Sequence, residues 1–366
     1  MTEKLNKQNL DKRLALLRKD MKESGLDGVI LINPANIYYY SGFYGEDSWL
    51  LIGLKECSLI TDGRYTAQAA LECPQCLVLC QNSTSKWAEL LRQSCHTWQI
   101  KKLGFEDSIF TYEHYRLMRK ALTDVDLFAI GELACAHRQI KDEDEIECLA
   151  KAAAIGDAAL FQIEAYLRAG ITEAELAREL NYAMYKKGAQ DLAFPTIAAA
   201  GKNGAKPHAK PNDYQLQNGD LVTLDFGAVY KGYHGDITRT LAIGSVSAKI
   251  REIYTLVQEA QEYAISAIHA GMTCGEADAL ARNIFEDAGF AEHFSHSLGH
   301  GTGLEIHEMP WLRKNNDAVL QVGHVVTVEP GLYFPEWGGI RIEDTVVITE
   351  KGAVALNKYP KDLLIF

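Results

Sequence analysis

Two stretches of the sequence, "LQNGDLVTLDFG" at residues 216–227 and "LQVGHVVTVEPG" at residues 320–331, are nearly the same. Each opens with a polar turn around a glycine and continues as an apolar run that predicts a buried β-strand. Each run also carries one acidic residue, Asp225 in the first and Glu329 in the second. A single carboxylate in a strand is ordinarily a hydrogen-bonded or edge residue. Two carboxylates at equivalent positions of two similar stretches indicate a common function.

The residues around these stretches are repeated as well. A helical pattern at residues 170–188 returns at residues 271–289. A His-x-x-Pro motif follows each pattern, with "HAKP" starting at His208 and "HEMP" starting at His307. Such a duplication predicts two similar halves related by a pseudo-twofold axis, with equivalent residues facing each other. We therefore expect the two acidic residues to point into one centre.

Two more carboxylates follow on the next predicted strands, Asp236 in "GYHGDITRT" and Glu343 in "GGIRIEDTVVIT". Four ionised carboxylates in one core are strongly destabilising unless cations pair with them. Two divalent ions balance the four charges, and His300 in "HSLGHGTGLEIHE" adds an imidazole. A set rich in carboxylate oxygen with one imidazole suits manganese or cobalt, with zinc also possible. We therefore expect two divalent ions, with manganese as the first choice.

The composition limits the classes of function. The chain has 366 residues, of which 47% are apolar and 23% charged, as in a globular protein with two domains. Its formal net charge of −12 disfavours binding to nucleic acid or to an anionic membrane surface. No segment has the roughly 18 apolar residues of a membrane helix, and residues 1–25 predict a charged amphipathic helix rather than a signal peptide. We therefore expect a cytoplasmic protein.

The sequence predicts two unequal domains. Residues 1–135 alternate short apolar strands with helical stretches, which indicates an α/β domain, and they show no evident reacting group. Residues 136–366 include the charged segment "RQIKDEDEIECL", a long alanine-rich helical pattern and the duplicated unit of helix, loop and paired strands. The predicted boundary therefore lies near residue 135.

The eight cysteines allow two interpretations. Cys73, Cys76 and Cys80, with Cys95 and His96 further along, have a loose resemblance to the spacing of a zinc site. A structural zinc site ordinarily needs a second pair of ligands, and the remaining cysteines are scattered singly. We favour small buried thiols in a reducing compartment over a zinc site.

The spacing of the five candidate ligands closely resembles that of the pita-bread metallopeptidases, and within them the Xaa-Pro peptidases aminopeptidase P and prolidase. The motifs that carry the resemblance are "TLDFGAVYKGYHGDITRT", "GHGTGLEIHEMP" and "EPGLYFPEWGGIRIEDTVVIT". The stretches "NIYYYSGF" and "LITDGRYTAQA" look like the creatinase-type N-terminal domain, so that the resemblance covers essentially the whole chain. It implies an α/β creatinase-like N-terminal domain and an α+β pita-bread catalytic domain with an internal pseudo-twofold duplication.

The resemblance also implies a role for each ligand. Asp225 would bind one metal ion, and His300 and Glu329 would bind the other. Asp236 and Glu343 would bridge the pair. A hydroxide between the two ions would attack the scissile carbonyl, with Glu329 as the proton shuttle.

Further residues near the metal centre follow from the same resemblance. His208, His296 and His307 match histidines that hydrogen-bond the substrate carbonyl and the tetrahedral intermediate. Arg341 would orient a bridging carboxylate or reach toward one end of the substrate. The chain departs from the usual pattern at two positions that are not ligands, where the family often has serine. These positions are Gly235, before Asp236, and Gly204, ahead of His208.

The substrate implied by the resemblance is a peptide with proline at its second position, whose scissile bond has no N–H. Aromatic residues near the ligands are candidates either for a pocket that holds the proline ring or for ordinary core packing. These candidates are Tyr233, Phe294, Tyr333 and Trp337. Aminopeptidase P accepts longer peptides and prolidase only dipeptides. We favour the aminopeptidase, with the Xaa-Pro dipeptidase as the alternative, and expect a homodimer.

Two other functions stay open as alternatives. A non-catalytic peptide-binding protein with the pita-bread fold would not need the ligands, yet all five positions hold the expected residue type. A methionine aminopeptidase ordinarily lacks a creatinase-like N-terminal domain, so residues 1–135 weigh against it. The metal content after dialysis and the release of an amino acid from an Xaa-Pro peptide would separate an enzyme from a binding protein.

Overall fold

The chain folds into two units. A computed structural model describes residues 7–82 and 86–366. Contacts between residues divide the chain into one unit that ends at Arg138 and a second that begins at Gln139. The boundary expected from the sequence, near residue 135, lies just before this division. Over the described ranges, every helix is too short or too polar to cross a membrane.

The N-terminal unit contains a six-stranded mixed sheet in the order β4-β3-β2-β1-β5-β6. In this sheet β1, β5 and β6 are parallel neighbours, whereas β2 is antiparallel to β1 and β3. The expected α/β domain is thereby confirmed, although residues 1–6 of the expected N-terminal helix lie outside the described residues. The elements are α1 (Lys7–Glu23), β1 (Gly28–Leu31), α2 (Pro34–Ser41), β2 (Trp49–Gly53), β3 (Cys57–Asp62), α3 (Thr66–Glu72), β4 (Leu77–Gln81), α4 (Trp87–Thr97), β5 (Lys102–Phe105), α5 (Tyr112–Ala121) and β6 (Asp126–Ala129).

The cysteines of the N-terminal unit differ in part from the expected free buried thiols. Cys73 and Cys95 are free and buried, but Cys80 is exposed. Cys57 and Cys76 form a disulfide, with their Cα atoms 4.8 Å apart. The sequence does not reveal this pair because pairing depends on the distance between Cα atoms in the fold. Within the described residues these cysteines form no cluster that could hold zinc.

The C-terminal unit consists of two halves, each with a pair of helices followed by a series of strands. The first half contains α6 (Glu143–Ile163), α7 (Glu173–Lys186), β7 (Asp191–Leu192), β8 (Ile197–Ala200), β9 (Leu221–Phe226), β10 (Ala228–Tyr230), β11 (Tyr233–His234) and β12 (Ile237–Ala242). The second half contains α8 (Ala248–Ala267), α9 (Cys274–Asp287), β13 (Gly299–Gly301), β14 (Glu308–Leu312), β15 (Val325–Val328), β16 (Gly331–Phe334), β17 (Gly338–Arg341), β18 (Glu343–Thr349) and β19 (Gly352–Ala355). The predicted duplication is therefore present in the fold.

The repeated helices begin in the same way because their sequences carry the same start signal. Thr172 caps α7, and Thr273 caps α9. In each case the threonine side chain accepts from a backbone N–H three residues on, where a glutamate bonds back to the threonine N–H. Such a capping box satisfies two donors that the first turn leaves unpaired.

Strands of the two halves join in one large sheet whose order is palindromic except for β14 at one edge, while β7, β10 and β11 form a second sheet and β16 and β17 a third. The order is β14-β13-β15-β18-β12-β9-β8, and β19 pairs with β18. The run β8-β9-β12 of the first half thus matches β13-β15-β18 of the second, and β12 and β18 meet at the middle. The pseudo-twofold axis passes between these two strands.

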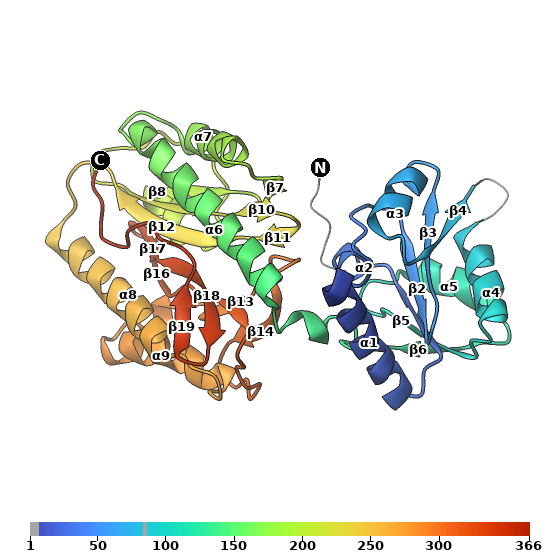
Figure 1. The fold of residues 1–366 in the computed structure, drawn as a ribbon. Coiled ribbons are helices and arrows are strands. Elements are labelled where there is room, and N and C mark those ends of the chain that lie inside the picture. Colours follow the sequence, from blue (N-terminus) through green and yellow to red (C-terminus); the bar gives the residue numbers. More distant parts are fainter. Residues whose placement is uncertain (1–6, 83–85) are drawn as a thin grey trace. The chain divides into compact units, whose positions relative to one another are not determined.

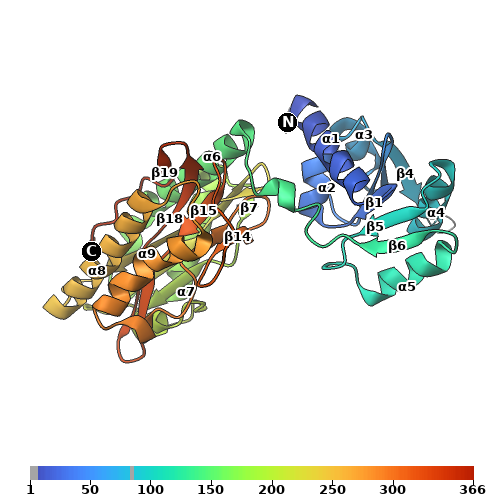
Figure 2. The ribbon, with the colours of Figure 1, turned by 90° about the horizontal axis from the view of Figure 1, so that it is seen from below.

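Each half also has its own hydrophobic cluster and helix pair. One cluster lies mainly between residues 155 and 243, the other mainly between residues 253 and 348. In Figure 1 the α6–α7 pair (green) lies beside β8 and β10, and the α8–α9 pair (orange) lies near β14 and β19. Figure 2 shows α8 and α9 side by side. The two cores support the sheet on either side of its middle.

The strand register brings predicted site residues together at that middle. Asp225 on β9 pairs with Thr238 on β12, and Thr238 pairs with Glu343 on β18. Residues in register on neighbouring strands point to the same face of a sheet. The carboxylates of Asp225 and Glu343 therefore share one face, although they come from different halves of the chain.

Candidate metal centre

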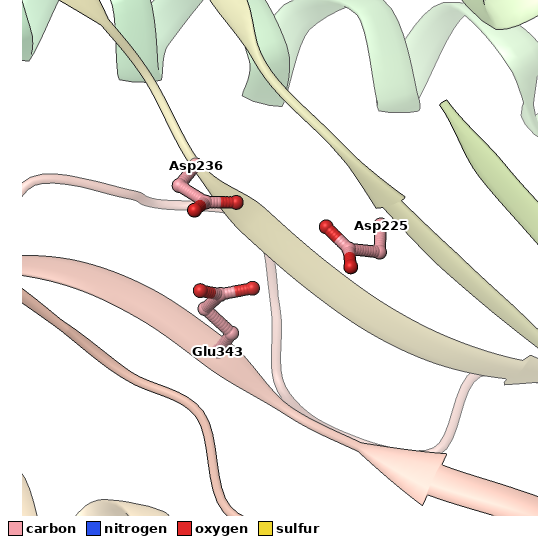
Figure 3. A group of neighbouring side chains, drawn as sticks. All are labelled: Asp225, Asp236 and Glu343. Atoms are coloured by element: carbon pink, nitrogen blue, oxygen red, sulfur yellow. The ribbon is translucent and has the colours of Figure 1, made fainter. Parts of the chain in front are cut away.

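Three carboxylates converge where the two halves join. Asp225 lies on β9, Asp236 directly precedes β12, and Glu343 begins β18. One oxygen of each side chain lies within 4.8 Å of an oxygen of the other two. Figure 3 shows the carboxylate groups of the three residues turned toward a common space. The prediction that acidic residues from both halves meet in one centre agrees with this geometry.

His300 on β13 and Glu329, just after β15, extend this group. His300 Nε2 lies 3.4 Å from Glu329 Oε1 and 3.6 Å from Asp236 Oδ2. His300 Nδ1 is 3.0 Å from the carbonyl oxygen of Gly301. Because a carbonyl only accepts, the ring proton is on Nδ1, and Nε2 presents a lone pair to the two carboxylates. A cation between the three atoms fits this arrangement.

Burial raises the pKa of three of the carboxyl groups, those of Asp236, Glu329 and Glu343. Burial raises the pKa of Glu329 to about 8. The pKa of Asp236 lies well above its ordinary value because of burial and the charge of Glu343. The pKa of Glu343 is also raised, by burial and the charge of Glu329. Asp225 Oδ1 is buried without a hydrogen-bond partner. These oxygens and a neutral imidazole therefore form a donor set that fits divalent cations.

Hydrogen bonds from neighbouring side chains orient the carboxylates. Arg341 Nη2 donates to Asp225 Oδ2 at 2.6 Å. Thr238 donates to Glu343 Oε2 at 2.6 Å, and Thr327 donates to Glu329 Oε1 at 3.0 Å.

Sequence reasoning missed the two threonines, although a signal for them exists. Thr238 lies two residues after Asp236, and Thr327 lies two residues before Glu329. Side chains two apart in an extended strand share a face. A threonine at that spacing from a predicted ligand was therefore a candidate partner.

A chain of hydrogen bonds links Arg341 to His296 through Tyr333. Arg341 Nη1 donates to the Tyr333 hydroxyl at 2.7 Å, and this hydroxyl lies 2.8 Å from His296 Nε2. His296 Nδ1 lies 2.8 Å from the carbonyl oxygen of Ser297, so that Nδ1 carries the proton and Nε2 accepts from Tyr333. Burial lowers the pKa of His296 to about 3. The His296 imidazole is therefore a neutral member of this series of hydrogen bonds.

A cavity of about 360 Å³ opens onto the carboxylates, and all nine predicted site residues line it. They are Asp225, Asp236, His300, Glu329, Glu343, His208, His296, His307 and Arg341. The His307 ring lies 4.4 Å from the His300 ring between centroids and stacks on Trp311. Phe194 and Ile306 add apolar walls, and Lys210 adds a cation.

The four aromatic residues expected around the proline ring do not line this cavity. Phe194 and Trp311 line it instead. The sequence left core packing open as the alternative for these residues, because closeness to a ligand in the sequence does not decide the face on which a side chain lies. The four residues have other partners: Tyr233 donates to Glu145, Phe294 packs on Phe285, Tyr333 bonds Arg341 and His296, and Trp337 stacks on Phe334.

The two glycines that depart from the family pattern lie in tight surroundings. A Cβ at Gly235 would lie 3.1–3.2 Å from atoms of Ala152, and a Cβ at Gly204 would lie 3.3 Å from the carbonyl oxygen of Ala199. Such contacts are short for carbon, so that a serine at either position requires a small backbone shift. Neither glycine lines the cavity.

Comparison with known proteins identifies the family. Residues 13–140 match the Creatinase/Prolidase N-terminal domain, and residues 147–350 match Metallopeptidase family M24. The chain belongs to metallopeptidase family M24. The M24 match confirms the expected pita-bread catalytic domain, and the first match confirms the creatinase-type N-terminal domain.

The relatives of this M24 metallopeptidase span its whole length. It is 38% identical over 357 residues to the Xaa-Pro dipeptidase of Pyrococcus furiosus, which covers 97% of this chain and 100% of the relative. The solved Xaa-Pro dipeptidase from Bacillus anthracis superposes with a TM-score of 0.95 and 40% identity over 98% of this chain and 100% of that one. The X-Pro aminopeptidase from Thermotoga maritima gives a TM-score of 0.89 and 37% identity over 96% and 98%.

The carboxyl groups of this M24 protein predict how its metal-free stability depends on pH. Folding raises the pKa of Glu329 from 4.5 to about 8, so that the folded state holds a proton which the unfolded chain has released. The free energy of unfolding of the metal-free protein should therefore fall as the pH rises from about 7 to about 8. Folding lowers the pKa of His296 and His300, and their contribution is nearly complete above about pH 7.

Thermal unfolding of chelated and manganese-loaded protein at both pH values checks this expectation. The increase in Tm on metal loading should be about 5 °C larger at the higher pH, because metal binding requires ionised carboxylates. A Glu329→Gln variant should show a shallower pH dependence of the metal-free Tm. A metal-free Tm that rises between the two pH values would contradict the expectation.

Proposed function

We propose that this chain is a metal-dependent Xaa-Pro dipeptidase. The observation that carries the proposal is the set of four carboxylates and one neutral imidazole at the cavity. Intact ligands and membership of a peptidase family support an enzyme over a peptide-binding protein. The names of the relatives favour the dipeptidase, which was the alternative from the sequence, over the aminopeptidase. The Thermotoga maritima structure keeps the aminopeptidase as a second candidate.

The residues around the cavity have separate tasks in this proposal. Two divalent ions, with manganese as the first to test, would supply a water nucleophile at neutral pH and Lewis acidity for the scissile carbonyl. Glu329 accepts the proton of the attacking water on its carboxylate and passes it to the leaving proline nitrogen. His208 and His307, on the cavity wall, donate hydrogen bonds to substrate carbonyl oxygens. Arg341 orients Asp225.

We also propose a homodimer as the active form.

A cation on the cavity wall suits a dipeptide. Lys210 lines the cavity two residues after His208, and its side chain is exposed. The proline of an Xaa-Pro dipeptide carries a free carboxylate, whereas in a longer peptide the same position is a neutral amide. Lysine attracts a carboxylate as a compact point charge. Lys210 therefore favours a substrate that ends at the proline.

This proposal predicts a higher kcat/KM for an Xaa-Pro dipeptide than for the corresponding Xaa-Pro-Xaa tripeptide. A Lys210→Gln variant should lower the value for the dipeptide by about fivefold, as expected for an exposed charge pair. Its value for the tripeptide should stay within about twofold of the wild type. Steady-state kinetics with added manganese measure both quantities.

The loop before His208 offers a matched control. Lys206 is also exposed but does not line the cavity, so Lys206→Gln should leave both substrates unaffected. Equal losses on both substrates in Lys210→Gln would contradict the role of Lys210. A preference of the wild type for the tripeptide would replace the dipeptidase with the aminopeptidase and leave the metal centre as proposed.

A further inference from the structure

A buried ion pair lies behind the loop that carries His307. This loop, residues 302–307, joins β13 to β14 and is called the His307 loop below. Lys141 Nζ donates to Glu308 Oε2 at 3.1 Å, and the two side chains are only 1% and 5% exposed. Removing one partner of such a pair leaves an uncompensated charge in the protein interior. The two residues are outside the set that lines the cavity.

The carboxylate of Glu308 packs directly against the His307 loop. Glu308 Oε1 accepts from the backbone N–H of Glu305 at 3.0 Å. The backbone at Gly303 comes so close that a Cβ there would lie 2.7 Å from Glu308 Oε2. Gly303 N–H in turn donates to the carbonyl oxygen of Glu305 at 3.1 Å. This carboxylate is therefore one support of the loop backbone, together with His234, whose N–H donates to the carbonyl oxygen of Gly303 at 2.8 Å.

The other end of the pair is fixed to the sheet. Lys141 lies just before α6, and its backbone N–H donates to the carbonyl oxygen of Gly323 at 2.9 Å. The preceding residue, Ile140, forms an isolated antiparallel bridge with His324, directly before β15. Lys141 thus holds Glu308 from a segment that does not belong to the loop.

His307 is the residue that this support affects most directly. It is the last residue of the loop and is joined to Glu308 by a peptide bond. Its ring contacts His300 and Trp311, with centroids 4.4 Å and 5.8 Å away. Within the described part of the chain no hydrogen bond fixes the ring, so that its direction depends on the backbone that carries it.

We propose that Lys141 and Glu308 are positioning residues that hold the His307 imidazole at the substrate carbonyl. The inference rests on the proposed function, in which His307 donates a hydrogen bond during the reaction. Displacement of a catalytic group by a fraction of an ångström lowers turnover without a comparable change in substrate affinity. The pair itself does not touch the substrate.

Kinetics of single and double variants test this proposal. Lys141→Met and Glu308→Gln should each lower kcat by about tenfold, with KM within about twofold and the manganese content unchanged. Lys141→Arg, which keeps the charge, should recover kcat to within about threefold of the wild type. In a His307→Ala background, Lys141→Met should cause no further loss, because the group it positions is already absent.

An activity-independent measurement separates this inference from the proposed function. Amide hydrogen exchange in manganese-loaded Lys141→Met should be faster at residues 302–307 and unchanged at the equivalent loop, residues 203–208. Glu308→Gln repeats this test if Lys141→Met does not fold. A wild type that cleaves no Xaa-Pro peptide would refute the proposed function, while the exchange result still decides whether the pair orders the loop. A further tenfold loss in the His307→Ala background, or unchanged exchange at residues 302–307, would overturn the positioning role.

Discussion

A Glu343→Gln variant is expected to lose turnover by about a thousandfold or more and to lose bound metal. The carboxylate of Glu343 is buried at the middle of the sheet, where it accepts from Thr238 and meets Asp225 and Asp236. The amide keeps the shape of the side chain but removes the negative charge that balances a divalent ion. We expect Asp225→Asn to behave in the same way, because Arg341 would then lose its charged partner as well.

Metal analysis after dialysis and single-turnover kinetics on an Xaa-Pro dipeptide measure the two effects. The matched control is Glu350→Gln, the same chemical change at an exposed position just after β18. It should keep wild-type metal content and turnover. Wild-type turnover in Glu343→Gln would remove Glu343 from the proposed ligand set.

A His307→Ala variant is expected to keep its metal ions and to lose about a hundredfold in kcat, as for a lost polarising hydrogen bond. The His307 side chain lines the cavity beside His300 but is absent from the group of three converging carboxylates. Burial lowers the pKa of His307, which favours a neutral imidazole that donates through an N–H. The equivalent residue of the first half, His208, lines the same cavity and should show a loss of similar size.

His269→Ala, at an exposed position outside the cavity, provides the control for these two variants. Metal content and kcat should be measured on the same samples. If His307→Ala or His208→Ala loses metal, that histidine is a ligand and its proposed role toward the substrate is wrong. If kcat is unchanged with the metal retained, neither role applies.

The two related halves and the convergence of their acidic residues were accessible from the sequence because the chain repeats itself. A carboxylate at one place in a strand has many explanations, but Asp225 and Glu329 occupy matching places in two copies of one unit. Because equivalent strands of a duplicated unit face each other across an axis, the duplication predicts that the two residues lie close together in the fold. The strand register and the common cavity agree with that reasoning.

Other parts of the site depend on contacts that a repeat does not encode. The ion pair of Lys141 and Glu308 joins residues far apart in the sequence. Lys141 also lies outside the sequence motifs that contain the candidate ligands. Tyr333 was a candidate either for the proline pocket or for the core, and its hydroxyl lies between Arg341 and His296. Such contacts follow from side-chain direction and from distances between strands, which sequence spacing leaves open. The disulfide between Cys57 and Cys76 in the N-terminal unit is another contact that sequence spacing does not predict.

The palindromic sheet gives the metal centre the organisation of a symmetric dimer interface. In such an interface the same surface of two subunits meets at a twofold axis, and each subunit contributes equivalent residues. Here β12 and β18 take the place of the two subunits, and each half supplies carboxylates to one shared group. Neither half alone contains all three of the converging carboxylates. The connection between them, residues 243–247, could therefore be cut to give two fragments whose reassociation, rather than folding of either one, creates the site.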